Sequence, residues 1–279
     1  MMPQLYRGKM YRAVQFASLL FFVLAVIQTS TAQSNYQVIS ISTPGTISGV
    51  VKWFGPEPHA LTFPVTKDPQ ICDPDSRKRV DLDRLIVGPQ GGVANTVVFL
   101  KDITKGKAMD LPAPRRFLNQ SHCRYEPHIL LVPRNALLEM KSSDATLHTI
   151  HMDGAATYNL PFPFPNQVIS RNMTNSGLVN LKCNGGHVWM NAEAFIVDHP
   201  YYAVTDESGK FEITDVPPGE YELVAWHEGW KLLRQENAVD VLTEKTVQRP
   251  IFSDPRTWDK HVSVHPGDTT VVNFSISDK

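Results

Sequence analysis

The chain has 279 residues, and its 28 acidic residues nearly balance its 27 basic ones. This balance provides no basic surface of the kind that nucleic-acid binding needs, so we expect no nucleic-acid partner. Twenty-one prolines and 16 glycines, spread among short β-branched and aromatic runs, favour turns and strands over long helices. The composition therefore predicts an all-β protein, long enough for one large domain or two small ones.

Residues 1–32 have the pattern of a secretory signal peptide. Three basic residues within the first 12 positions precede an apolar run, Ala13 to Ile27, and Ala32 offers a cleavage site. The alternative is an uncleaved membrane anchor, but the run is shorter than the roughly 20 apolar residues that a spanning helix needs. The pattern predicts a periplasmic or secreted protein with no transmembrane segment after cleavage.

Strand patterns begin after a short predicted linker at residues 33–44. GTISGVVKWFG alternates apolar and small or polar side chains, and a second strand, NTVVFLKDI, follows a proline- and charge-rich loop at 57–84. Residues 105–126 are basic and proline-bearing, which we interpret as a linker or domain boundary.

Six short strand-like segments crowd between residues 127 and 199, and turn residues separate most of them. They are HILLVP, ALLEMKS, LHTIHM, NQVIS, GLVNLKC and NAEAFIVDH. This density of short strands predicts an antiparallel sandwich or barrel.

The last third of the chain begins with YAVTDESGKFEITDVPPGEYELVAWHEGW, where two alternating strands are joined by Ser-Gly and Pro-Pro-Gly turns. Residues 231–262 have a looser pattern, and TTVVNFSIS is predicted to be the final strand.

Three cysteines leave one unpaired if two of them form a disulfide in an exported protein. Cys72 and Cys123 both lie in polar loop sequences that suit a disulfide. We therefore predict a Cys72–Cys123 bridge and a functional Cys183.

Cys183 opens the stretch CNGGHVWM, which places a thiol, the imidazole of His187 and the thioether of Met190 within eight residues. Alternation along GLVNLKC points Cys183 to the same face as Val179 and Leu181, which is the core face. A lone buried cysteine is usually an inert hydrophobe. Sulfur ligands of both kinds together with imidazole are instead the soft set that selects copper.

A second imidazole is expected from SSDATLHTIHM. His148 shares its strand face with Ile150 and Met152, whereas His151 points the other way, so His148 is the preferred ligand and His151 the alternative. His128 is a further candidate, either as a ligand, as a donor to a ligand, or as a histidine that merely begins a strand.

Together, SSDATLHTIHM and GLVNLKCNGGHVWM resemble the cupredoxins, small Greek-key β-sandwiches that hold copper. The resemblance implies one copper ion bound by His148, Cys183 and His187, with Met190 as a weak axial ligand. The short His–Met spacing is similar to half of the dinuclear copper loop of cytochrome oxidase subunit two. That loop has another cysteine where this chain has Val179, so the implied site holds one metal ion.

Two other stretches, GTISGVVKW and the segment YAVTDESGKFEITDVPPGEYELVAWHEG, resemble the transthyretin-like, carboxypeptidase regulatory-like β-sandwich. Together the two resemblances imply a discontinuous regulatory-like domain at 45–110 and 199–279, with a cupredoxin-like copper-binding domain at 116–198. They also imply an exported bacterial protein.

The expected function is mononuclear copper binding for electron transfer or copper handling, with a redox protein as a candidate partner and no enzymatic activity. A zinc site at the same residues would leave Met190 without a role. The alternative function is an extracytoplasmic carbohydrate-binding or adhesion module with an aromatic platform at Tyr201, Tyr202, Trp226 and Trp230, although packing in a sandwich core explains such aromatics equally well.

Overall fold

A computed structural model of the chain describes residues 35–56, 58–111 and 116–278. The predicted signal peptide at 1–32 lies outside the described residues. The described residues fall into one compact unit. It contains a single helix of four residues, and nearly all other regular structure is strand, which confirms the predicted all-β class. None of the helices within the described ranges is long and apolar enough to cross a membrane.

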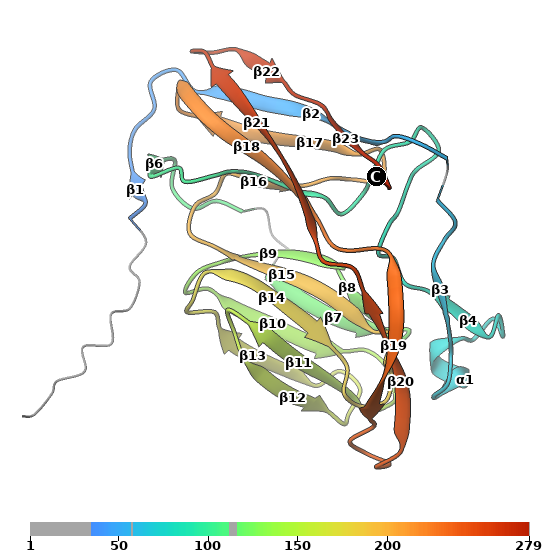
Figure 1. Cartoon of the computed structure of the whole chain (residues 1–279). Helices are drawn as coiled ribbons and strands as arrows, with labels where there is room; N and C mark the ends of the chain where they lie inside the picture. The colour runs from blue at the N-terminus through green and yellow to red at the C-terminus, as the bar shows by residue number, and fades with distance from the viewer. Residues whose placement is uncertain (1–34, 57, 112–115, 279) are drawn as a thin grey trace, which may run out of the picture. The chain divides into compact units, whose positions relative to one another are not determined.

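Two sheets form a first sandwich, here named sandwich A (Figure 1). One sheet has the strand order β13 (Val168–Asn172), β10 (Leu137–Ser142), β7 (Phe117–Ser121) and β8 (Arg124–Glu126). The other has the order β12 (Tyr158–Phe162), β11 (His148–Gly154), β14 (Gly177–Lys182), β15 (Asn191–Val197) and β9 (Ile129–Pro133).

Two further sheets form a second sandwich, sandwich B. One has the order β16 (Tyr202–Val204), β5 (Val97–Leu100), β18 (Gly219–His227) and β21 (Arg256–Val264). The other has the order β17 (Lys210–Val216), β2 (Gly45–Trp53) and β22 (Thr269–Val271), with β23 (Phe274–Ile276) also paired to β2.

The remaining elements are three strand pairs and the short helix. The pairs are β1 (Gln37–Val38) with β6 (Lys105–Gly106), β3 (Thr62–Pro64) with β4 (Arg79–Asp81), and β19 (Leu232–Val239) with β20 (Thr246–Phe252). The helix, α1, spans Pro69–Cys72.

Each sandwich has its own buried core. Both sheets of sandwich A contribute to one cluster, for example Leu138 and Met140 from β10 and Ile150 and Met152 from β11. A separate cluster joins the two sheets of sandwich B. A third, smaller cluster joins β9 and β15 of sandwich A to β5 and β18 of sandwich B. The domain limits at 45–110, 116–198 and 199–279 stay a prediction.

Three sequence interpretations need correction. The loop at 57–84 contains the β3–β4 pair and α1, the linker at 105–126 contains β6, β7 and β8, and the looser segment at 231–262 contains the β19–β20 hairpin and most of β21. These strands escaped notice because they are short or show no apolar alternation; β19, for instance, is exposed along nearly its whole length. Sandwich A is also not wholly antiparallel, since β7 pairs parallel to β10 and β9 parallel to β15.

The predicted disulfide between Cys72 and Cys123 is confirmed. It joins α1 to the turn between β7 and β8 across 51 positions of sequence. The segment at 61–82, here named the cap segment, also packs Phe63, Val80 and Leu82 into the core of sandwich A. The cap segment is therefore attached to sandwich A both covalently and by apolar burial.

The core of sandwich A offers a matched pair of leucines that tests the strand alternation. Leu138 is fully buried and its neighbour Leu137 is 58% exposed. We expect Leu138→Ala to lower the free energy of unfolding by about 2–5 kcal/mol, because it leaves a cavity in a closed core. Leu137→Ala should change it by no more than about 0.5 kcal/mol. Urea unfolding of both variants measures the difference, and equal losses would contradict the assigned strand faces.

Candidate metal centre

Strand register brings the predicted ligands to one end of sandwich A. Cys183 directly follows β14, and β14 runs antiparallel to β11 with Lys182 opposite His151. His148, three residues before His151, therefore lies opposite the loop that follows Cys183. Both His148 and Cys183 are fully buried, as the alternation along their strands predicts.

Three side chains converge at this position. His148 Nδ1 lies 3.2 Å from His187 Nδ1, and His187 Nδ1 lies 3.9 Å from Cys183 Sγ. One ligand atom from each of the three residues lies within 4.8 Å of the other two. All three side chains are fully buried. The arrangement is a compact set of two nitrogens and one sulfur that could hold a metal ion.

The far nitrogens of both imidazoles are bonded to carboxylates. His148 Nε2 lies 2.9 Å from Asp144 Oδ2, and His187 Nε2 lies 3.0 Å from Asp68 Oδ2. Because a carboxylate accepts a hydrogen bond, each Nε2 carries the proton, which leaves the Nδ1 lone pair of a neutral ring free to bind metal. The donor set therefore fits a metal ion on the inner side of the two rings.

Electrostatics favour a thiolate at Cys183. Burial by itself would raise the pKa of the thiol, but hydrogen bonds and charge from His148 and His187 outweigh burial and hold this pKa well below its ordinary value. Burial would likewise lower the pKa of His148, yet the hydrogen bonds to Asp144 and Cys183 raise it to about 9. A metal ion that binds here would displace any proton on His148 Nδ1, because a ligating imidazole must be neutral.

The sulfur of Cys183 also accepts hydrogen bonds from the backbone. Gly185 N lies 3.3 Å and Thr149 N 3.5 Å from Sγ. The hydroxyl of Thr149 accepts a hydrogen bond of 2.7 Å from Asn184 N, which ties the start of the loop to β11. These contacts fix the direction of the sulfur before any ligand arrives.

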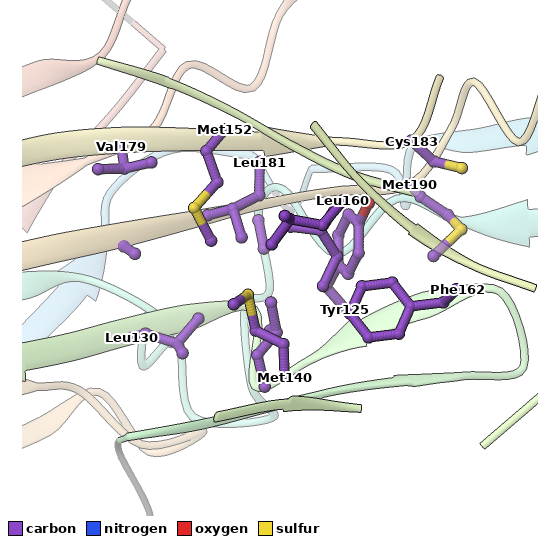
Figure 2. Packing of buried hydrophobic residues seen from close by; sticks show 14 of the residues in the cluster. Tyr125, Leu130, Met140, Met152, Leu160, Phe162, Val179, Leu181, Cys183 and Met190 are labelled. Atoms are coloured by element: carbon purple, nitrogen blue, oxygen red, sulfur yellow. The ribbon is translucent and has the colours of Figure 1, made fainter. Parts of the chain in front are cut away.

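Met190 is buried in the same core as Cys183. Figure 2 shows the side chains of Met190 and Cys183 at the same end of the core, which is also the end where Phe162 lies. Met190 N donates a hydrogen bond of 3.0 Å to His187 O, so the chain turns back between these two residues. The turn keeps Met190 three residues from His187, and its role as a weak ligand stays a prediction.

Side chains from distant segments bind the carbonyl groups of the ligand loop, Cys183 to Met190. Arg249 of β20 donates to Cys183 O at 2.7 Å, and Lys67 of the cap segment donates to Gly185 O at 2.7 Å. Lys67 also pairs with Asp240 at the end of β19, again at 2.7 Å. The loop is thus held between the cap segment and the β19–β20 hairpin.

Gly186 is needed at its position in this loop. Its φ of +89° is a conformation that side-chain-bearing residues rarely adopt, and a Cβ there would approach Asp240 Oδ2 to 2.6 Å. Gly186 therefore lets the ligand loop pass close to Asp240, at the end of β19.

The disulfide adjoins the cluster as well. The sulfurs of Cys72 and Cys123 and one ring nitrogen of His187 all lie within 4.8 Å of one another. Trp189 donates from Nε1 to Cys123 O at 3.2 Å and lies edge-on to the His187 ring. These groups close the side of the site that faces the cap segment.

His151 and His128 are not brought into the cluster. His151 is half-buried on the opposite face of β11. His128 instead bonds to the buried carboxylate of Glu228, which also pairs with Arg84 at 2.8 Å. A cavity of about 20 Å³, lined in part by His128 and Met190, lies between this ion-pair group and the ligand loop.

Sequence reasoning missed both carboxylates that bond the histidines. Asp144 carried a weak signal, because it stands four residues before His148 in SSDATLH. Asp68 carried none, since it lies 119 positions before His187 and meets it only in the folded chain. Arg249 and Lys67 were missed for the same reason.

Comparisons with known proteins identify β-sandwich relatives. Residues 198–251 match the family described as BOS complex subunit NOMO1-like, second beta sandwich domain, over β16 to β19 and most of β20. This agrees with the resemblance of that region to a transthyretin-like sandwich. None of the curated proteins matches the chain in sequence.

Several solved structures are similar in part. A copper-containing nitrite reductase from Thermus scotoductus SA-01 is 16% identical over 33% of this chain and 24% of its own, with a TM-score of 0.28. A purple cupredoxin from Nitrosopumilus maritimus is 14% identical over 29% of this chain and 98% of its own, with a TM-score of 0.26. A mutant of amicyanin in the reduced state is 18% identical over 32% of this chain and 87% of its own, with a TM-score of 0.28. The match spans about a quarter of the nitrite reductase.

Glu193 of β15 provides a test of how burial and a neighbouring charge affect the pKa of a carboxyl group in sandwich A. Burial, and next the charge of Glu228, raise its pKa to about 8. At pH values between about 4.5, the ordinary pKa, and about 8, Glu193 is ionised in the unfolded chain but keeps its proton in the folded chain. The free energy of unfolding therefore decreases as the pH rises through this range.

We expect Glu193→Gln to become more stable relative to the unmodified chain as the pH rises from about 5 to about 8. Chemical unfolding at several pH values measures this. The exposed Glu139→Gln on β10 is the matched control and should leave the pH dependence unchanged. A constant difference between Glu193→Gln and the unmodified chain would show that Glu193 is not protonated in the fold.

Proposed function

We propose that this chain binds one copper ion through His148, Cys183 and His187, with Met190 as a weak fourth ligand, and that it serves electron transfer or copper handling. The observation that carries the proposal is the convergence of two imidazole Nδ1 atoms and one thiolate sulfur in a fully buried cluster. Bound copper would supply one-electron oxidation and reduction at this position. The proposal is supported by this geometry, not by the low structural similarity scores.

Ligand chemistry favours copper over zinc. Two imidazoles and one thiolate with a thioether nearby form the set that blue copper sites use, whereas zinc takes nitrogen, thiolate or carboxylate ligands. A thioether such as that of Met190 suits copper, whereas zinc would take a harder ligand or water in its fourth position. The copper proposal therefore gives Met190 a role that a zinc site would not.

Burial favours transfer of electrons over conversion of a substrate. His148, Cys183 and His187 have no exposed surface, and the cap segment and the β19–β20 hairpin contact the loop that carries two of them. A small-molecule substrate would need an open position on the metal. An electron needs no such opening, so we propose a non-enzymatic carrier or handling protein with a protein partner.

An extracytoplasmic location is part of the proposal. In the sequence, it is supported by the pattern of a signal peptide at residues 1–32. The Cys72–Cys123 disulfide supports it, since such bonds persist in oxidising compartments and are rare in the cytosol.

The alternative function, a carbohydrate-binding module, receives little support from its four candidate aromatics. Tyr201 is fully buried, and Trp226 and Trp230 are each 7% exposed. Tyr202 is half-buried and its ring stacks on Phe99. A stacking platform needs ring faces open to solvent, whereas these rings pack within the fold. We accordingly keep copper binding as the proposed function.

Copper titration of the metal-free protein tests the proposal. We expect one equivalent of Cu(II) to produce an intense visible band from thiolate-to-copper charge transfer, because a sulfur ligand lies in the cluster. Cys183→Ser should abolish the band. His151→Ala is the matched control, since it removes a histidine from the same strand but from the opposite face, and should keep the band. Stoichiometric copper binding with no dependence on Cys183 would refute the ligand assignment.

Competition between metals tests the choice of copper. Protein offered equal copper and zinc should retain copper, because divalent copper binds nitrogen and sulfur ligands more tightly than zinc does. Met190→Leu should retain one copper with an altered visible and electron paramagnetic resonance spectrum. Retention of zinc in place of copper, with Met190→Leu indistinguishable from the unmodified protein, would favour the zinc alternative.

A further inference from the structure

Each imidazole of the metal centre is hydrogen-bonded to its own carboxylate, which lies outside the ligand loop. The bond is made by the ring nitrogen that points away from the cluster. Asp144 precedes β11, and Asp68 belongs to the cap segment. Each approaches the Nε2 atom of one ring within 3.0 Å, while the Nδ1 atoms face each other and the sulfur. The two pairs have the same geometry although the carboxylates come from unrelated parts of the chain.

The two carboxylates are themselves fixed. Asp144 accepts backbone hydrogen bonds from His122 N at 2.8 Å and Cys123 N at 2.9 Å. Asp68 accepts one of 2.7 Å from the hydroxyl of Thr146, through the same oxygen that bonds His187. Neither carboxylate can turn away from its ring without breaking these bonds, so each acts as a rigid acceptor.

We propose that Asp68 and Asp144 are positioning residues that stabilise the divalent state of copper bound at His148, Cys183 and His187 over the monovalent state. This inference rests on the proposed function and deepens it. A carboxylate that accepts a hydrogen bond from Nε2–H gives the ring partial imidazolate character, which makes Nδ1 a stronger donor to the metal. A stronger donor and a nearby negative charge both favour the ion of higher charge.

The charge balance around the cluster supports the same direction. The Cys183 thiolate and the two carboxylates place three negative charges close to the metal position. Of the neighbouring cations, Lys67 is paired with Asp240, and Arg249, which bonds the carbonyl of Cys183, adds one positive charge against these three negative ones. A divalent ion is attracted to a given anion twice as strongly as a monovalent ion at the same distance. The divalent state of copper therefore gains more from these anions than the monovalent state.

The burial of the two carboxylates predicts which of them contributes more to stabilising divalent copper. The side chain of Asp144 is 7% exposed and that of Asp68 is 26% exposed. Water and salt screen an exposed charge more than a buried one. The contribution of Asp144 should therefore exceed that of Asp68, and only the contribution of Asp68 should weaken noticeably in high salt.

The experiment compares the full chain with Asp68→Asn and Asp144→Asn, with Asp83→Asn as the matched control. Asp83 lies in the loop between β4 and β5 and pairs with Arg124 at 2.6 Å, so its substitution removes one charge near the cap segment without touching a histidine. Cu(II) and Cu(I) affinities and the reduction potential are measured for each protein.

We expect each histidine-bonded variant to lose about 10- to 100-fold in Cu(II) affinity, with a smaller loss for Cu(I). Each tenfold loss for Cu(II) relative to Cu(I) raises the potential by about 59 mV. Asp83→Asn should leave both affinities unchanged. Electron spin-echo spectra, which detect the remote imidazole nitrogens, should change in the two variants because Nε2–H loses its charged acceptor.

A purely structural role for the carboxylates predicts equal losses for both copper states and an unchanged potential, and that result would overturn the inference while leaving the copper site intact. Failure of the unmodified chain to bind copper would instead overturn the proposed function, and the inference with it. Asp144 also anchors the backbone near Cys123, so its variant is the one at risk of misfolding. The Asp68→Asn variant is then the deciding one, because the Asp68 side chain is partly exposed and its carboxylate bonds only side chains.

Discussion

The metal centre depends on hydrogen bonds that fix an irregular loop in the interior of the protein. The turn after β14 carries carbonyl groups that no strand partner satisfies, and a buried carbonyl without a donor costs about 1–3 kcal/mol. Arg249 and Lys67 supply the donors from the hairpin and the cap segment. Because the position of Cys183 follows from this turn, two segments remote in sequence determine where the sulfur lies.

The cap segment helps to keep the ligand cluster buried. The cap segment contributes apolar side chains to the core of sandwich A and is tied to it by the Cys72–Cys123 disulfide. It also brings Asp68 to His187. Exclusion of water strengthens each charge interaction in the cluster and leaves the hydrogen-bonded positions of the rings as the main control on metal binding. A single structural element thus combines burial, covalent attachment and electrostatic tuning.

A closed, rigid cluster suits a protein that exchanges electrons or stores a metal ion. Ligands fixed beforehand need little rearrangement when the charge of the bound ion changes. The buried group of His128, Glu228 and Arg84 shows that this fold also uses histidine as a hydrogen-bond partner of a buried carboxylate, away from the metal centre. Composition alone does not separate these two uses of histidine, whereas the partners of each ring do.

The sequence by itself determined the all-β class, the disulfide pairing and the inward direction of His148 and Cys183, because strand alternation and residue chemistry are local properties. It did not reveal the strands at 105–126 or the hairpin after β18, since their side chains are largely exposed or their runs too short to alternate visibly. Only the tertiary structure joined Asp68 to His187 and supplied donors to the ligand loop. Those contacts connect segments more than 60 positions apart, and no periodicity along the chain encodes them.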